Sequence, residues 1–114
     1  MNRSGNYHQQ VYDVTKMIPK GRVSTYGAIA DFLALGSARM VGWALNQCHH
    51  QEDVIPAHRV VNRKGELSGR MMFESPTKMQ ELLEAEDVEI KNDRVQNFDV
   101  LFWHPKELEI DIAD

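Results

Sequence analysis

Apolar residues recur every three or four positions in three stretches of the N-terminal half of the chain, at Tyr7–Ile18, Tyr26–Leu33 and Ser37–Cys48. Residues with this spacing share one face of an α-helix, so the pattern predicts three helices that each bury one face. Pro19 and Gly21 end the first helix, and Gly36 supplies a turn between the second and the third.

Polar residues stand directly before the second and third stretches. Ser24 or Thr25 can cap the second helix and Ser37 the third, because a side-chain oxygen there accepts a free backbone N–H. Two short helices joined by a turn with glycine form a helix-turn-helix, and Arg39 then lies in the first turn of its recognition helix. Many small helical domains share this pattern, so by itself it leaves DNA binding open.

The C-terminal half predicts shorter elements. Val60–Val61 and Glu66–Leu67 flank a turn with glycine, which is consistent with a short hairpin or an irregular loop. Ser75–Pro76 predicts the start of a helix that runs to about Glu86. Val88–Ile90 is a short strand or extended segment. The sequence therefore predicts a mainly α fold with short β segments, in one domain that spans residues 1–114.

Composition indicates a soluble globular protein, with 42% hydrophobic and 26% charged residues. No apolar run approaches the roughly 20 residues of a membrane span, and the first ten residues lack the apolar core of a secretory signal. Cys48 is the single cysteine, so no intrachain disulfide forms, which agrees with a reducing compartment.

The net charge of −4 is unevenly distributed along the chain. Residues 81–114 hold eleven acids and three bases, so the remainder carries a net charge of +4. The acidic end, about 104–114, is expected to be frayed. Either one face of the protein is basic or the charges simply solvate the surface, and both readings stay open. The basic residues of the remainder fall mainly in two clusters: Lys16, Lys20, Arg22 and Arg39, then Arg59, Arg63, Lys64 and Arg70.

The chain has no phosphate-binding loop and no paired-carboxylate motif. Cys48, His49 and His50 are adjacent, but neighbouring residues of a helix point in different directions, so they do not favour one shared metal ion. We expect no metal and no cofactor. The residues that remain as candidates for chemistry or binding are Tyr26, Arg39, His58, Arg59, Ser68 and Arg70.

Four segments, "IPKGRVSTYGAIA", "ARMVGWAL", "IPAHRVVN" and "GELSG", resemble the C-terminal DNA-binding domain of the O6-alkylguanine-DNA alkyltransferases in order and spacing. The resemblance covers most of residues 7–86 and implies a winged-helix-like helix-turn-helix fold. In those enzymes the third segment contains Pro-Cys-His-Arg-Val, and the cysteine thiolate takes the alkyl group from the base. Here Ala57 occupies the cysteine position.

The sequence most resembles the alkyltransferase-like proteins of this family, which are short and lack the cysteine. Tryptophan is their common replacement, so Ala57 departs from the usual pattern. Arg70 stands where the enzymes have a second glycine, and Phe102–Pro105 resembles an aromatic-proline segment of the subgroup. Leu67 replaces a tyrosine of many enzymes, and Cys48 replaces an asparagine that supports their reactive site.

The resemblance also implies roles for individual residues in flipping a nucleotide out of DNA from the minor groove. Arg39 would fill the gap in the base stack, and Tyr26 would crowd the 3′ phosphate. His58 and Arg59 would hold the reactive turn together, and the methyl side chain of Ala57 would leave room for large alkyl groups. The residues implied to contact DNA are Tyr26, Ser37, Ala38 and Arg39, and those implied to line the lesion pocket are Tyr26, Ala57, His58, Ser68 and Arg70.

The function that follows is a non-enzymatic sensor of O6-alkylguanine in double-stranded DNA, which hands lesions to nucleotide excision repair proteins. We expect a monomer that acts in the cytoplasm or nucleoid, or in the nucleus of a eukaryote, without contact with membranes. Two alternatives remain: an alkyltransferase whose catalytic cysteine is mutated to alanine, and a helix-turn-helix regulator that ignores damage.

Overall fold

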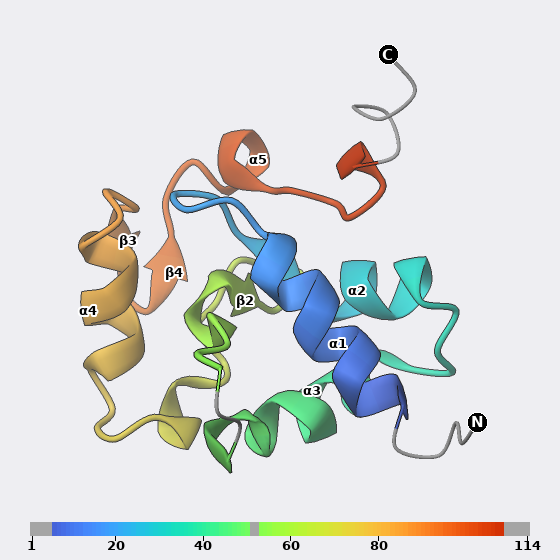
Figure 1. Cartoon of the computed structure of the whole chain (residues 1–114). Helices are drawn as coiled ribbons and strands as arrows, with labels where there is room; N and C mark the ends of the chain where they lie inside the picture. The colour runs from blue at the N-terminus through green and yellow to red at the C-terminus, as the bar shows by residue number, and fades with distance from the viewer. Residues whose placement is uncertain (1–5, 51–52, 109–114) are drawn as a thin grey trace.

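The N-terminal half of the chain forms three helices that pack against one another (Figure 1). The computed structural model describes residues 6–50 and 53–108 and contains α1 (Asn6–Met17), α2 (Tyr26–Phe32) and α3 (Ala38–Asn46). A short 3-10 helix, η1 (Cys48–His50), follows α3. The three predicted helices are therefore confirmed. Their buried faces meet in a core made of Val11, Tyr12, Val14, Ile18, Ile29, Ala30, Val41, Ala44, Leu45, Cys48, Ala57, Val60 and Trp103.

The two predicted helix caps have different outcomes. Thr25 caps α2, because its hydroxyl oxygen accepts a hydrogen bond of 3.0 Å from the backbone N–H of Ala28. Ser37 stands at the N-cap position of α3, but its side chain makes no capping hydrogen bond. The expectation that the Ser37 hydroxyl caps α3 is wrong; only its carbonyl takes part, accepting from the N–H of Met40 at 3.2 Å.

A parallel strand pair joins the two halves of the chain. β1 (Ser24–Thr25) pairs with β2 (Val60–Val61), with Ser24 opposite Val60. Val60–Val61 is thus not half of a hairpin with Glu66–Leu67, and the alternative of an irregular loop is correct. The side-chain oxygen of Asn62 holds that loop by accepting from the N–H groups of Lys64 and Glu66. The pairing brings the 3-10 helix η2 (Ala57–Arg59) close to the start of α2.

The C-terminal half folds around a second, smaller core (left side of Figure 1). It contains η3 (Arg70–Met72), α4 (Lys78–Glu84), β3 (Ile90–Lys91) and β4 (Arg94–Val95). The strands form an antiparallel hairpin, whose turn residues Asn92 and Asp93 have left-handed φ angles of 54° and 59°. This core is made of Val23, Val61, Leu67, Met79, Leu83, Val88, Ile90 and Val95.

Two features of this half differ from the expectation. α4 begins after Thr77 rather than at Ser75–Pro76, and the Ser75 hydroxyl is instead 3.4 Å from the Thr77 hydroxyl. The helix α5 (Phe98–Leu101) was not predicted; only four residues long, it lacks the repeated apolar spacing that marks a longer helix.

The segment after α5 is anchored on the N-terminal half. Trp103 is buried, and its backbone N–H donates to the carbonyl of Val23 at 2.7 Å. His104 lies 3.3 Å from the carboxylate of Asp31 on α2. The chain is therefore held in place as far as Leu108, and the rest of the acidic end predicted to fray, residues 109–114, lies outside the described residues. No helix of the described part is long and apolar enough to cross a membrane.

Candidate nucleic-acid interface

The exposed face of α3 carries a cation at its beginning. Ser37, Ala38 and Arg39 are all exposed. Within residues 6–50 and 53–108, the Arg39 guanidinium has no hydrogen-bond or ion-pair partner. A positive charge in the first turn of a helix is mildly unfavourable because the helix dipole is positive there. Folding therefore gives no reason for an arginine at this position, which favours a role in binding.

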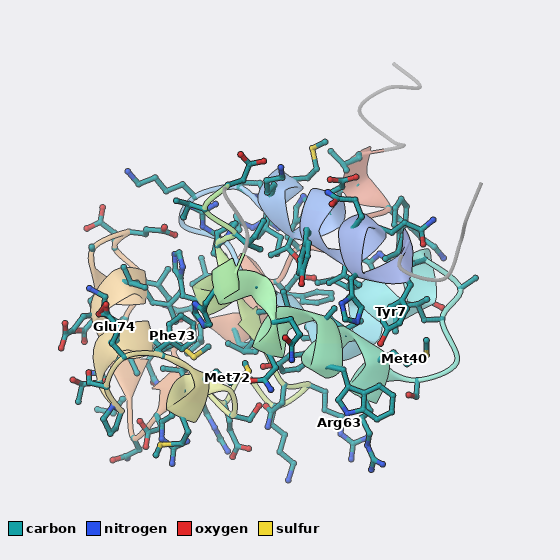
Figure 2. All side chains as sticks on the ribbon, turned by 60° about the horizontal axis from the view of Figure 1, so that its bottom comes forward. Tyr7, Met40, Arg63, Met72, Phe73 and Glu74 are labelled. Carbon is teal, nitrogen blue, oxygen red and sulfur yellow. The ribbon has the colours of Figure 1, made fainter. Side chains whose placement is uncertain are left out.

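A hollow of about 500 Å³ lies between the starts of α2 and α3 and the loop after β2. Arg63 and Lys64 on this loop are both exposed, and Arg63 lies near α3 in Figure 2. The hollow thus has a basic rim beside Arg39. Its lining residues are Tyr26, Gly27, Ala38, Asn62, Arg63, Lys64 and Glu66.

Tyr26 lines this hollow, and its hydroxyl group lies against Gly69. Burial raises the pKa of the Tyr26 phenol, and a hydrogen bond with the Ser68 side chain acts in the opposite direction. A Cβ atom at Gly69 would lie 2.6 Å from the Tyr26 hydroxyl oxygen and 2.8 Å from the terminal methyl group of Met72. A larger residue at 69 would therefore force the ends of the Tyr26 and Met72 side chains to move, a role for Gly69 that the sequence did not reveal.

Residue 57 lies at the start of η2 and carries only a methyl group. Ala57 is 4% exposed, and its N–H donates to the carbonyl of Ile55 at 2.7 Å. The single thiol, Cys48, is also buried, and burial raises its pKa above the ordinary value. The turn at Ala57 therefore holds no thiol.

The two residues after Ala57 share one buried carboxylate. His58 Nε2 lies 2.8 Å from Glu86 Oε2, and Arg59 donates to both Glu86 oxygens at distances from 2.8 to 3.2 Å. Arg59 also donates to the carbonyl of Ile18, and the N–H of Gly21 donates to Glu86 at 3.2 Å. This agrees with the expected structural role of His58 and Arg59. Glu86 could not be recognised from the sequence, because a carboxylate 28 residues from its partner leaves no local pattern.

The ionisation of this cluster follows from burial and hydrogen bonding. Burial opposes the charged form of Glu86, but hydrogen bonds from Arg59, His58 and Gly21 outweigh it and lower the pKa to about 2. Burial also lowers the pKa of His58, against the opposing effect of Glu86. Glu86 is therefore a carboxylate and His58 a neutral imidazole near pH 7. Because a carboxylate only accepts, the proton of His58 lies on Nε2, and Nδ1 remains an acceptor.

The structure does not bring the five predicted lesion-pocket residues into one cavity. Tyr26 lines the hollow described above, whereas Ser68 and Arg70 line a second one of about 290 Å³. Arg70 donates to the carbonyl of Leu67 at 3.1 Å and lies 3.9 Å from the Asp93 carboxylate. His58 lines a third, mostly apolar cavity of about 560 Å³, and Ala57 lines none of the three. A shared lesion pocket stays a prediction.

Arg70 and His58 have different neighbours in their two hollows. The polar hollow of Arg70 is completed by Glu66, Asn92 and Asp93. The apolar cavity of His58 is lined by His49, Val54, Ile55, Met72, Phe73, Glu74, Lys78 and Leu82, of which Met72, Phe73 and Glu74 are labelled in Figure 2. No group of three His, Cys, Asp or Glu residues that could hold a metal ion occurs in the described part of the chain.

The chain belongs to the family described as "6-O-methylguanine DNA methyltransferase, DNA binding domain", which it matches over residues 6–88. Within this family it is similar to alkyltransferase-like protein 1 of Schizosaccharomyces pombe, with 40% identity over 89 residues, 77% of this chain and 82% of the relative. It is also similar to a DNA base-flipping protein of Vibrio parahaemolyticus, with 40% identity over 84 residues, 71% and 79% of the two chains.

Solved structures give the same grouping. A crystal structure of S. pombe Atl in complex with damaged DNA containing O6-carboxymethylguanine aligns with a TM-score of 0.79 and 35% identity, over 91% of this chain and all of that one. The Mycobacterium tuberculosis OGT in complex with DNA aligns with a TM-score of 0.61 and 36% identity, over 74% of this chain and 51% of that one. The resemblance inferred from the four sequence segments and the predicted fold class are confirmed.

Proposed function

We propose that this protein binds duplex DNA that contains O6-alkylguanine, turns the alkylated nucleotide out of the base stack and holds it without removing the alkyl group. One observation carries the proposal: the chain has the DNA-binding domain of the family, yet the segment that resembles the reactive turn of the enzymes carries the buried methyl group of Ala57. Support comes from the similar S. pombe protein, whose crystal structure contains damaged DNA.

The exposed face of α3 supplies the DNA contacts in this proposal. Its N-terminal residues Ser37 and Ala38 approach the phosphates, and Arg39 enters the duplex where the nucleotide has left. Unstacking a base requires a few kcal/mol. The planar guanidinium offsets part of that cost, because it can stack between the neighbouring bases while its charge is attracted by the phosphates. Tyr26, at the edge of the hollow beside α3, presses on the phosphate of the rotating nucleotide.

The flipped base occupies the region between Tyr26, Ser68 and the turn at Ala57. Ser68 is exposed and offers its hydroxyl group to a base edge. Arg70 reaches the face of the base after leaving Asp93, a contact of 3.9 Å between partly exposed side chains that contributes little stability. A methyl group at residue 57 fills little of the region, so the site accepts alkyl groups larger than methyl.

A protein that holds a lesion without repairing it needs a repair system downstream. We propose that the bound lesion is passed to nucleotide excision repair proteins, and that the protein acts as a monomer where the cell keeps its DNA. The 114 residues then serve as one DNA-binding unit.

Binding to matched duplexes tests the function directly. Two labelled duplexes of one sequence differ in a single guanine, which is O6-alkylated in one of them. We expect tighter binding to the alkylated duplex and a fluorescence gain from a reporter base next to the lesion when the nucleotide leaves the stack. Equal affinity for the two duplexes would instead identify a helix-turn-helix regulator that ignores damage.

The buried cluster of His58, Arg59 and Glu86 favours a second candidate, an alkyltransferase whose cysteine was replaced by alanine. In such a protein the neutral His58, with Nδ1 as an acceptor, would be ready to take a proton from a thiol at residue 57. Rapid transfer of an alkyl group from DNA to the variant Ala57→Cys would favour this second candidate. Slow or absent transfer would favour the sensor.

A further inference from the structure

The exposed face of α3 carries a large aromatic side chain in addition to Arg39. Trp43 is 55% exposed, whereas the other tryptophan of the chain, Trp103, is 3% exposed. Tryptophan side chains are highly buried on average in folded proteins. The neighbouring Gly42 adds to the open character of this face, because a Cβ atom there would meet no atom within 4 Å.

Trp43 lies on the same side of α3 as Arg39. Residues three or four apart on an α-helix are neighbours on its surface, and Arg39, Trp43 and Asn46 are all exposed and follow this spacing. The rise from Arg39 to Trp43 is about 6 Å along the helix axis, which is close to two base-pair steps of duplex DNA at roughly 3.4 Å each. A helix that inserts Arg39 into a duplex therefore holds Trp43 within reach of the adjacent nucleotides.

The charges around this face indicate which partner fits it. Residues 32–50 contain no Asp or Glu, although the chain has 17 acids and a net charge of −4. Arg39 lies on the face itself, and Arg63 and Lys64 are exposed on the loop that borders the hollow at the start of α3. An apolar ring on a helix without acids, bordered by basic side chains, is complementary to the sugars and phosphates of a nucleic acid. Glu66, the acid that lines the hollow, is paired with Arg94.

We propose that Trp43 contacts duplex DNA directly, with its indole ring against the sugars and base edges beside the gap that Arg39 fills. This proposal rests on the proposed function, since it requires α3 to enter a DNA groove. Apolar side chains of groove-binding proteins commonly pack against base steps in this way, and the indole N–H can donate to an acceptor in the groove. The contact adds affinity for duplex DNA of any sequence, because every nucleotide presents a sugar to the groove.

Tryptophan fluorescence reports on this contact without an added label on the protein. The wild type and the variant Trp43→Phe are titrated with an undamaged duplex and with the same duplex containing O6-methylguanine, and binding is followed independently by the anisotropy of labelled DNA. We expect DNA to change the emission of the wild type and to protect it from iodide quenching. The emission of Trp43→Phe, which comes from the buried Trp103, should stay constant while the anisotropy still shows binding.

A second variant measures the effect on affinity. Trp43→Ala should weaken binding to both duplexes by about tenfold, as for other aromatic contacts with nucleotides. The dependence of affinity on salt should keep its slope, because no cation is lost. Val100→Ala is the matched control, since Val100 is 75% exposed on α5, at the opposite side of the molecule from α3 in Figure 1. This control should leave both affinities unchanged.

The outcomes separate this proposal from the function on which it rests. DNA binding by the wild type with no change in emission, or a change that persists in Trp43→Phe, would overturn the Trp43 contact and leave the sensor function standing. An unchanged affinity of Trp43→Ala would do the same. If the wild type does not bind either duplex in the anisotropy assay, both proposals are wrong.

Discussion

Arg59 and Arg39 are used in opposite ways by the same small fold. Arg59 is only 16% exposed at its side chain and is fixed by Glu86 and by the carbonyl of Ile18. Arg39 is exposed, with no partner in the described part of the chain. The inner arginine therefore stabilises the turn at Ala57, whereas the outer one is available to a ligand.

The comparison shows that the turn at Ala57 is firmly held although it carries no thiol. Glu86 holds two segments together, because it accepts from the N–H of Gly21 and is bound by the turn residues His58 and Arg59. A scaffold of this kind can still position DNA-binding groups although no thiol remains at residue 57. Substitutions in the cluster around Glu86 should therefore affect mainly folding. Substitutions on the exposed face of α3 should affect mainly DNA binding.

Glu86→Gln should have the largest effect, on the free energy of unfolding. Its folded-state pKa of about 2 lies below the ordinary value of 4.5, so ionised Glu86 stabilises the fold by about 3 kcal/mol at neutral pH. Glutamine removes the charge and leaves Arg59 with a neutral partner. Urea denaturation at pH 7 should show a loss of about this size, in the range expected when one partner of a buried ion pair is removed.

The stability that the Glu86 charge contributes should depend on pH. A carboxylate with a lowered pKa stabilises the fold above its unfolded-state pKa, and this stability disappears as the pH falls from about 4.5 to about 2. The difference between wild type and Glu86→Gln should therefore shrink at pH 3. Glu89→Gln, at an exposed position, is the control and should have little effect at either pH. A difference that is the same at pH 7 and pH 3 would contradict the role of the Glu86 charge.

Arg39→Ala should have the largest effect on DNA binding. Removing the side chain leaves the gap in the base stack unfilled, so affinity for alkylated duplex should fall by about 10- to 100-fold, the range for loss of a stacked side chain. Affinity for undamaged duplex should fall less, because no gap forms there. Unfolding free energy should change by less than about 0.5 kcal/mol, as for most exposed substitutions.

Arg39→Lys sharpens the same test. Lysine keeps the charge but has no planar group to stack between bases, so it should recover only part of the lost affinity and of the reporter-base fluorescence. Full recovery would show that the charge alone matters. Equal fractional losses of Arg39→Ala on damaged and undamaged duplexes would show that Arg39 does not fill the gap.

The exposed face of α3 could be predicted from the sequence, whereas the cluster around Glu86 could not. The helices α1 to α3 follow from their apolar spacing, and the roles predicted for Arg39 and Ala57 rest on short segments that resemble a known family. Glu86 could not be identified, because its partners are brought to it by tertiary packing. The parallel pairing of β1 with β2 was missed for the same reason: two-residue strands 36 positions apart leave no periodic signal.

Arg63→Ala should produce a smaller change that is independent of the lesion. Arg63 is exposed on the basic rim and is expected to meet one phosphate. Its removal should weaken binding several-fold on both duplexes and reduce the slope of log affinity against log salt by about 0.9, the value for one phosphate contact on duplex DNA. Lys91→Ala, on the β3–β4 hairpin, is a charge-matched control that should keep the slope. An unchanged slope for Arg63→Ala would remove this loop from the DNA interface.

Transfer of an alkyl group to the protein should be undetectable. Intact-mass measurement after incubation with an excess of O6-methylguanine duplex should show no added methyl group, because Ala57 has no nucleophile and the buried Cys48 has a raised pKa that keeps it in the thiol form. A stoichiometric mass gain by the wild type would contradict the sensor function.

Ala57→Cys should show at most slow transfer. The new thiol would be as buried as Ala57, which disfavours the thiolate, and Cys48 stands where the enzymes have a supporting asparagine. His58 and Glu86 alone then provide the proton acceptor and its orientation. Rapid, stoichiometric methylation at residue 57 would show that this pair is sufficient, and would favour an alkyltransferase that lacks only its cysteine. Slow or absent transfer, with lesion binding retained, would favour the sensor function.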